Sequence, residues 1–266
     1  IESGIVKVPR VPIDDDAIGD LPTYLHLWDH IGHHLPKKLP KDELVDDWVP
    51  PKELEGALES LHRSYAARFD EWERTLRELG EPPPVMIIVC PNTTVSQLVF
   101  DWVAGRSMQR DDGTEVLRPG KLDLLSNVAD GQWLARPRTI LVDSAAIESG
   151  ESFSKEFKSA AAAEIEVFKA EYRRRNPGAD PAKITDEDLL REVMNTVGKR
   201  GHLGEQVRCV VSVSMLTEGW DANTVSHILG VRAFGSQLLC EQVVRAEGAQ
   251  VLPVLGVRVA VLGHPG

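Results

Sequence analysis

The spacing of apolar residues predicts a long amphipathic helix in the first third of the chain. Between Lys52 and Leu79 the apolar side chains recur at steps of three or four residues: Leu54, Leu58, Leu61, Tyr65, Phe69, Trp72, Leu76 and Leu79. This spacing places them on one stripe of a helix, which would pack against a core. Gly80 and the prolines at 82–84 end the pattern and predict the end of the helix.

Short, mainly apolar runs predict a set of buried strands, at 85–90, 139–144, 207–216 and 224–231, and the run at 85–90 is uniformly apolar. Runs without polar alternation are typical of strands that are covered on both faces. Helical patterns lie between or after these runs, at 94–105, 153–175, 187–198 and 236–244. The alternation of strands and helices predicts an α/β fold with a parallel sheet flanked by helices.

Two segments fall outside this alternation. Residues 1–50 are rich in Pro and His, and they predict an extended lead-in with a short helix near 23–31. Residues 106–137 predict a polar insertion, because Asp-Asp-Gly and Arg-Pro-Gly mark turns within it. The chain begins at Ile1 inside an apolar phrase, and we expect the sequence to be a fragment of a longer protein.

Charge and cysteine content narrow the class of protein. The net charge is −11, which argues against coating nucleic acid by bulk charge but leaves room for a local basic groove. Cys90, Cys209 and Cys240 form no CxxC pair and lie in apolar segments, so we expect buried, reduced thiols in a cytoplasmic protein. No apolar run reaches the roughly 18 residues that a membrane helix needs, so no membrane partner is expected.

The segment Thr-Glu-Gly-Trp-Asp-Ala-Asn at 217–223 follows a buried strand and carries the strongest candidate chemistry. In open α/β sheets, ligands bind at the carboxyl ends of the strands. Gly219 permits a tight turn or a close approach to a ligand. Thr217 and Asn223 can donate to phosphate oxygens, and Asp221 can accept from ribose hydroxyls or bind a metal. A polar loop closed by an Asx turn explains the same residues without a ligand.

A family resemblance favours the ligand-binding interpretation. LTEGWDANTVSHILG, followed by RAFGSQLLCEQVV, resembles the fifth and sixth motifs of superfamily 2 helicases of the DEAD/DEAH-box type. It is most similar to the restriction (Res) subunit of type III restriction enzymes. PPPVMIIVCPNTTVSQLVFDWVAG resembles the segment that opens the second RecA-like domain of that family, and IESGIVKVPRVPIDDD resembles the junction that leaves the first.

The resemblance implies a division of the chain. Residues 1–50 would form the interdomain junction and lead-in, and 51–245 the second RecA-like domain of an ATP-dependent DNA helicase or translocase. Residues 246–266 would be an atypical tail. The implied partners are double-stranded DNA, the first RecA-like domain of the parent protein and, where the parent is a restriction enzyme, a methyltransferase subunit.

The resemblance also implies roles for single residues at the DNA. Thr217 would contact the nucleic-acid backbone, together with Asn92 and Thr93 in the segment after the first strand.

Other residues of the same motifs would bind the nucleotide. Gly219 and Asp221 would lie in the interdomain cleft near the nucleotide sugar, and Gln242 would face the ATP phosphates. ATP and Mg²⁺ would be bound by the intact parent, with no metal or cofactor expected on this chain alone. Closure of such a cleft would couple hydrolysis to the grip on DNA.

The sequence lacks the parts of an ATPase that the first RecA-like domain supplies. A phosphate cradle has the form GxxxxGK[ST]. Gly198 and Lys199 are present, but Val193 and Arg200 occupy the positions of the first Gly and the hydroxyl. The acidic run 186–188 fits the start of a helix better than a magnesium motif. We therefore expect no ATP hydrolysis by this chain alone.

The sixth motif departs from the family pattern after Val244. The family has Gln, two residues, Gly, Arg, two residues, Arg. Here Gln242 is followed by Arg245 with no Gly, and the second Arg is missing, so Arg245 is only a displaced candidate for the arginine finger. A reading-frame slip after Val244 would explain the break, and a genuine divergence is the alternative. The second functional hypothesis is accordingly a non-catalytic remnant or interaction domain.

A histidine cluster in the lead-in is a further candidate for a metal site. It consists of His26, His30, His33 and His34, with spacings of four, three and one. On a helix three of them would share a face, which suits zinc. Gly32 and Pro36 argue against a helix there, so the sequence predicts an exposed His-rich loop and no metal site.

Overall fold

The computed structural model describes residues 27–38, 48–109, 112–142, 158–159, 161–178, 180–213, 224–232 and 258–260. Nine strands lie in this part of the chain: β1 (Val85–Val89), β2 (Gly105–Gln109), β3 (Glu115–Pro119), β4 (Val128–Ala129), β5 (Gln132–Trp133), β6 (Thr139–Val142), β7 (Cys209–Ser212), β8 (Val225–Gly230) and β9 (Arg258–Ala260). The helices there are α1 (Leu27–Ile31), α2 (Lys52–Thr75), α3 (Thr93–Ala104), α6 (Ala162–Arg175) and α7 (Asp186–Asn195), with 3₁₀ turns η2 (Arg77–Leu79) and η3 (Pro181–Lys183).

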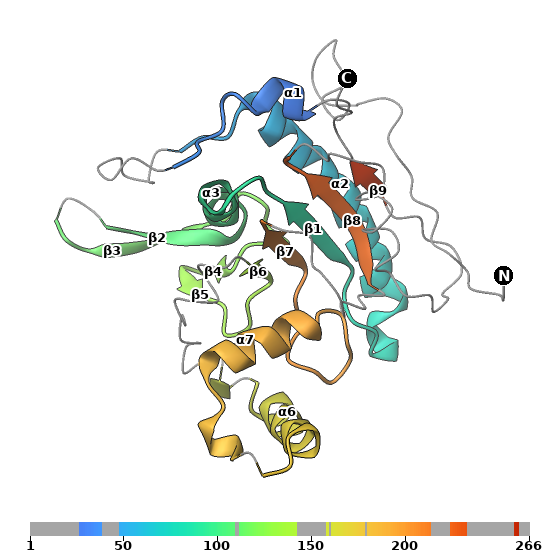
Figure 1. The fold of residues 1–266 in the computed structure, drawn as a ribbon. Coiled ribbons are helices and arrows are strands. Elements are labelled where there is room, and N and C mark those ends of the chain that lie inside the picture. The colour runs from blue at the N-terminus through green and yellow to red at the C-terminus, as the bar shows by residue number, and fades with distance from the viewer. Residues whose placement is uncertain are drawn as a thin grey trace.

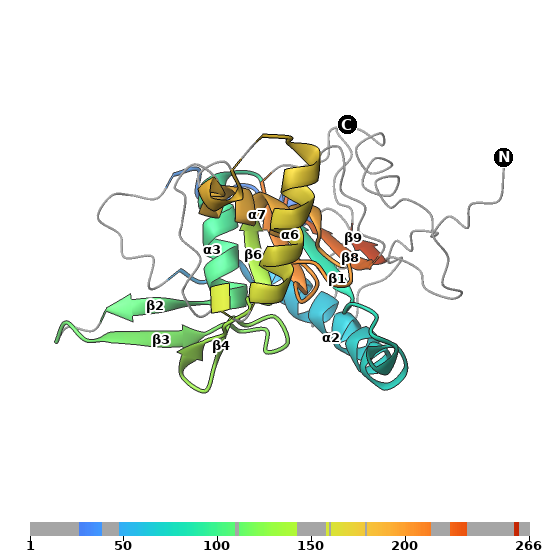
Figure 2. The ribbon, with the colours of Figure 1, turned by 90° about the horizontal axis from the view of Figure 1, so that it is seen from below.

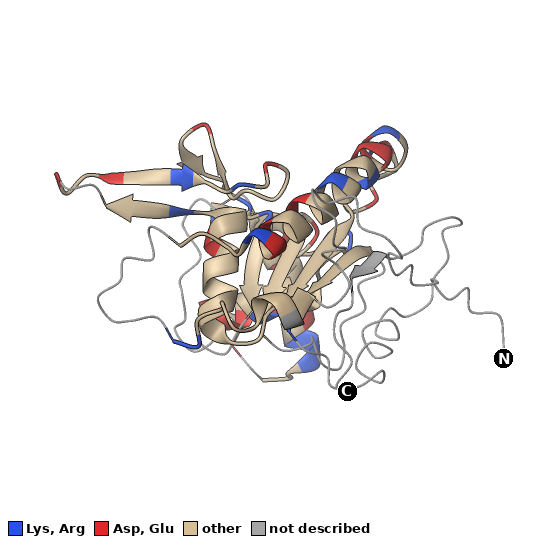
Figure 3. Cartoon of the chain, turned by 90° about the horizontal axis from the view of Figure 1, so that it is seen from above, with Lys and Arg blue, Asp and Glu red and all other residues tan. Residues whose placement is uncertain are grey.

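The main sheet has five parallel strands in the order β6-β7-β1-β8-β9 (Figure 1). Each apolar run that predicts a strand contains one. Strands β1, β6, β7 and β8 contain no Asp, Glu, Lys or Arg, and charged residues lie on the helices, the connections and the β2–β3 hairpin around them (Figure 3). The predicted α/β fold with a parallel sheet flanked by helices is therefore confirmed.

Both faces of the sheet are covered by helices, and alternate residues of β1 pack into the cores on the two faces. Met86 and Ile88 belong to the core under α1, α2 and α3. Val85, Ile87 and Val89 belong to a second core under α6 and α7. Successive side chains of a strand point to opposite faces, so a strand buried on both sides must be apolar throughout.

Helix α2 buries the predicted stripe except at its end. Leu54, Leu58, Leu61, Tyr65, Phe69 and Trp72 are all buried. The predicted continuation to Leu79 is wrong, because α2 ends at Thr75 and Leu79 is 64% exposed in the short turn η2. Gly80 closes that turn with φ of 74°, a left-handed conformation that glycine adopts at little cost.

Helix α7 begins where the acidic run predicts a helix start. Thr185 caps it, accepting from the Asp188 backbone N–H while the Asp188 carboxylate accepts from the Thr185 backbone N–H. This reciprocal capping box satisfies two backbone donors, and the acidic residues complement the helix dipole. Helix α6 occupies the second half of its predicted range, ending at Arg175.

The predicted insertion at 106–137 has two parts with different environments. Its first part is the antiparallel hairpin β2–β3, which projects from the rest of the molecule beyond the carboxyl end of α3 (Figures 1 and 2). Its second part is not a polar excursion, because Leu122 and Leu125 are buried in the core with α2 and α3.

Asn127 fastens this second part to the edge of the sheet. The buried side chain donates from Nδ2 to the Thr139 carbonyl oxygen at 2.8 Å. Its Oδ1 accepts from the backbone N–H groups of Arg138 and Thr139 at 2.7 and 2.9 Å. One amide thus satisfies three backbone groups at the start of β6, which lie in a buried or partly buried environment.

The lead-in and the tail each contribute one described element. Helix α1 packs its buried residues Leu27 and Ile31 against α2, within the predicted lead-in. In the predicted tail, β9 pairs with β8 at the sheet edge, which agrees with the apolar character of that segment. The predicted helix 236–244 lies outside the described residues.

Candidate site at the carboxyl edge of the sheet

The parallel arrangement brings three chain connections together at the carboxyl edge. Cys90 N donates to the Ser212 carbonyl oxygen at 2.7 Å, so β1 and β7 end side by side. On the other side of β1, Val231 N donates to the Val89 carbonyl oxygen at 2.7 Å. The segments that follow β1, β7 and β8 therefore leave the sheet as neighbours, in the position where open α/β sheets bind ligands.

The segment after β1 carries Asn92 and Thr93, the two residues that the sequence assigns to the nucleic-acid backbone. Asn92 is the N-cap of α3 and accepts from Val95 N at 2.9 Å. Its Nδ2 donates to the Pro36 carbonyl oxygen at 3.3 Å. Since its amide is engaged at both ends, Asn92 is a structural residue first, and a cap of this type is preferred by helices generally. Thr93 is exposed at the first position of α3 and does not cap the helix.

The segment after β7 carries the strongest motif of the sequence. Strand β7 ends at Ser212, four residues before the end of its predicted range. Residues 214–223 then connect the carboxyl end of β7 to the amino end of β8, on the other side of β1. Thr217, Gly219 and Asp221 lie within this connection and are outside the described residues, as are Gln242 and Arg245.

Arg232 is a further basic residue at this edge, outside the motifs of the sequence. It follows β8, and its guanidinium donates to the Val213 carbonyl oxygen at 3.3 Å, at the first residue after β7. The bond ties the exit of β8 to the exit of β7 across the end of β1. A charged residue directly after an uncharged buried strand is the signal that could have identified it.

The lead-in adds further positive charge beside the same edge. Pro36 reaches Asn92 through its carbonyl oxygen, and Lys37 and Lys38 follow it, both exposed. These two lysines and Arg232 are basic residues in segments that adjoin this edge, on a chain whose net charge is −11. We call Lys37, Lys38 and Arg232 the edge cations.

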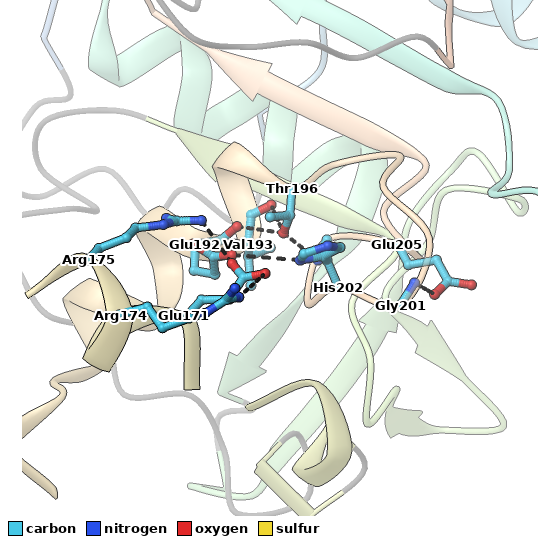
Figure 4. Close-up of polar contacts among 10 residues, drawn as sticks. Glu171, Arg174, Arg175, Glu192, Val193, Thr196, Gly201, His202 and Glu205 are labelled. Carbon is cyan, nitrogen blue, oxygen red and sulfur yellow. Dashed lines mark hydrogen bonds and ion pairs between the residues drawn. The ribbon is translucent and has the colours of Figure 1, made fainter. Parts of the chain in front are cut away.

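The histidines of the lead-in are exposed where the structure describes them. His30 lies in the last turn of α1, and His33 and His34 lie in the turn that follows the helix. Among the described residues, the one group of three potential metal ligands that lie close together is elsewhere: Glu171 of α6, Glu192 of α7 and His202 of the turn after α7 (Figure 4). No motif in the sequence marks this group, since the three residues lie on separate elements with no motif spacing.

Burial raises the pKa of Glu192, the central residue of that group. The chief cause is desolvation, and the neighbouring Glu171 carboxylate adds to it, while Arg175, His202 and Lys199 act in the opposite direction. The pKa in the folded protein is thus above its value in the unfolded chain. The ionised carboxylate therefore lowers the stability of the fold as pH rises through that interval, and the penalty is absent below the pKa of the unfolded chain.

Replacing Glu192 by Gln is expected to remove this pH-dependent penalty. In metal-free buffer, the free energy of unfolding of Glu192→Gln should increase relative to that of the wild type as pH rises from about 4 to about 8. Urea unfolding at both pH values measures it. Glu187→Gln, on the exposed side of the same helix, is the control and should show no such trend. A constant difference at all pH values would show that Glu192 titrates alike in both states.

The fold and this edge define an α/β protein with an open, all-parallel sheet covered by helices on both faces. Comparison with protein-family models and with curated protein sequences found no match. Among the described residues, no helix is both long and apolar enough to cross a membrane. The two described cysteines, Cys90 and Cys209, are buried and unpaired, and burial raises the pKa of both thiols.

Proposed function

We propose that the chain is the second RecA-like domain of an ATP-dependent DNA helicase or translocase of the type III restriction class. One observation carries the proposal furthest. The segments with the helicase-like sequences follow β1 and β7, which are neighbouring parallel strands. Motifs separated by more than a hundred residues along the chain are thereby joined to one edge of one sheet.

The edge cations support a role for this edge in binding a nucleic-acid backbone. Such binding needs positive charge and hydrogen-bond donors but no base contacts, because phosphates carry no sequence information. Thr93 and, in the connection after β7, Thr217 would add hydroxyl donors. The uncharged strands beneath would then supply the rigid support on which the loops are mounted.

ATP and Mg²⁺ would be held between this domain and a first RecA-like domain. This chain would supply Gly219, Asp221 and Gln242 to the cleft, and the partner domain would supply the phosphate cradle. The chain alone contains no such cradle, so the proposal assigns hydrolysis to the parent protein and not to the isolated chain. A methyltransferase subunit would be a partner of that parent.

Binding of duplex DNA by the chain tests the role of the edge. We expect weak binding, with a dissociation constant of about 10⁻⁴–10⁻⁶ M at physiological salt, falling steeply in affinity as salt rises. The double variant Lys37→Gln/Lys38→Gln should weaken binding equally for unrelated duplex sequences. It should also reduce the slope of log affinity against log salt by about 2, because each lysine that pairs with a phosphate adds about 1 to that slope. Fluorescence anisotropy over a salt series measures both.

A charge-matched variant separates this edge from general charge effects. Lys169→Gln/Lys183→Gln removes the same charge from the layer of α6 and η3, on the opposite face of the sheet. The salt slope should then stay at its wild-type value. Equal losses in the two double variants, or tight binding that is insensitive to salt, would contradict the proposed DNA-binding edge and favour the alternative of a non-catalytic interaction domain.

A further inference from the structure

The packing of α6 against α7 brings two carboxylates and an imidazole together, away from the carboxyl edge of the sheet. Glu171, Glu192 and His202 each offer one ligand atom, and these atoms lie within 4.8 Å of one another. In Figure 4 the three side chains converge from two helices and from the turn after α7. None of them has a part in the proposed DNA or nucleotide site.

The Glu192 side chain is the most buried of the three. It is 6% exposed, and its neighbour His202 has Nδ1 3.9 Å from Oε1. That distance is too long for a hydrogen bond. A buried carboxylate normally has a counter-ion or several donors, because taking its charge out of water is costly. A cation located between Glu192 and its two neighbours would offset this cost.

The turn that carries His202 is held in place at several points. Thr196 Oγ1 donates to the Glu192 carbonyl oxygen at 2.6 Å and accepts from Gly204 N at 3.0 Å. Glu205 Oε2 accepts from Gly201 N at 2.7 Å. These bonds fold the turn back over the end of α7, so the imidazole faces Glu192 while 28% of the His202 side chain stays open to solvent. An ion can enter from that open side.

We propose that Glu171, Glu192 and His202 form a zinc site that fastens α6 to α7. One imidazole nitrogen and two carboxylate oxygens are ligands that zinc accepts, and three protein ligands leave a fourth position for water. Zinc lies about 2.0–2.2 Å from such atoms, so the three ligand atoms must close to about 3.4 Å from one another. Two carboxylates with a divalent ion and a neutral imidazole also form a set without net charge.

The arginines beside the site do not prevent this closure. Arg175 and Arg174 lie 2.8 and 3.8 Å from the two oxygens of Glu171. Their side chains are 65% and 77% exposed, so they can turn into water. The metal would then replace the arginines as the partner of the Glu171 carboxylate, whose side chain is 19% exposed.

Zinc titration of the full chain tests the site. The chain is first stripped with a chelator, and binding is followed by calorimetry and by the melting temperature. We expect zinc to raise the melting temperature by about 2–4 °C or more. Glu192→Gln and His202→Ala should each weaken zinc binding by about 100-fold or more, because even loss of an outer-shell partner costs about 10–100-fold. The Co²⁺-loaded chain should lose its visible absorption in the same two variants.

Two controls decide between this site and adventitious binding. Glu187→Gln, which changes an exposed carboxylate of α7, should keep wild-type affinity. His33→Ala/His34→Ala should also keep it, because the exposed histidines of the lead-in are not ligands. The proposal is overturned if no zinc binds, or if binding survives in Glu192→Gln and His202→Ala and disappears in the lead-in variant. Circular dichroism checks that each variant is folded. If Glu192→Gln does not fold, the zinc affinity of His202→Ala alone tests the site.

Discussion

Rewriting three residues after Val244 is expected to raise ATP turnover about 10³-fold or more in a protein that joins this chain to an intact first RecA-like domain. The substitutions are Arg245→Gly, Ala246→Arg and Ala249→Arg, which restore Gln, two residues, Gly, Arg, two residues, Arg from Gln242 onward. An arginine that meets the γ-phosphate contributes about 10³–10⁵ in rate in phosphoryl transfer. Phosphate release with and without duplex DNA measures the gain.

Two further variants make this result specific to the proposed function. In the rewritten protein, Ala246→Gln in place of Ala246→Arg should return turnover to the low level. Asp221→Ala should also lower it, since Asp221 is assigned to the nucleotide cleft. If the rewritten protein hydrolyses ATP no faster than the unaltered one, the sixth-motif assignment is wrong, and the hypothesis of a non-catalytic remnant or interaction domain gains support.

Asn127→Ala is expected to destabilise the fold by about 3 kcal/mol. The substitution leaves the Thr139 carbonyl oxygen and the N–H groups of Arg138 and Thr139 without their partner. Each buried group left unsatisfied costs about 1–3 kcal/mol, and the loss falls where the segment 122–128 joins the sheet edge. Urea unfolding followed by circular dichroism measures the change in the free energy of unfolding.

An exposed asparagine provides the matched control. Asn176 lies at the end of α6, and its Nδ2 donates to the Tyr172 carbonyl oxygen at 3.2 Å in contact with solvent. Asn176→Ala should change stability by less than about 0.5 kcal/mol, as substitutions of exposed residues usually do. A similar small effect for Asn127→Ala would mean that water replaces its three bonds and that the segment is held by Leu122 and Leu125 alone.

The strands and most helices could be predicted because their signals are local. A run such as Val85–Val89 has no polar face, and only a strand buried on both sides satisfies that pattern. The capping sequence at Thr185 predicts a helix start, because the residues that form the capping box lie within four positions of one another. The end of α2 is harder to predict, because helix-compatible spacing continues to Leu79 while the backbone has already tightened into a 3₁₀ turn.

The parts that could not be predicted depend on which elements meet. Nothing in the spacing of β7 indicates that it lies between β6 and β1. Glu171 and His202 have no recognisable relation in sequence, and only the packing of α6 on α7 brings them to Glu192. Leu122 lies in a segment whose composition is polar, and its burial follows from Asn127 tying that segment down. The sequence assigns Asn92 to a ligand, although an Asn just before a helix also signals a cap.

The strand order has a consequence for how the protein is made. Strand β1 is the centre of the sheet, yet its partners β7 and β8 come far later in the chain, with Met86 pairing to Cys209 and His227. A ribosome adding about 5–20 residues per second delivers those partners on the order of ten seconds after β1. During that interval the newly made Val85–Val89 segment is an apolar strand without hydrogen-bonding partners, which is prone to aggregation. Slow translation of the later half, or shortage of chaperones, should therefore lower the yield of folded protein.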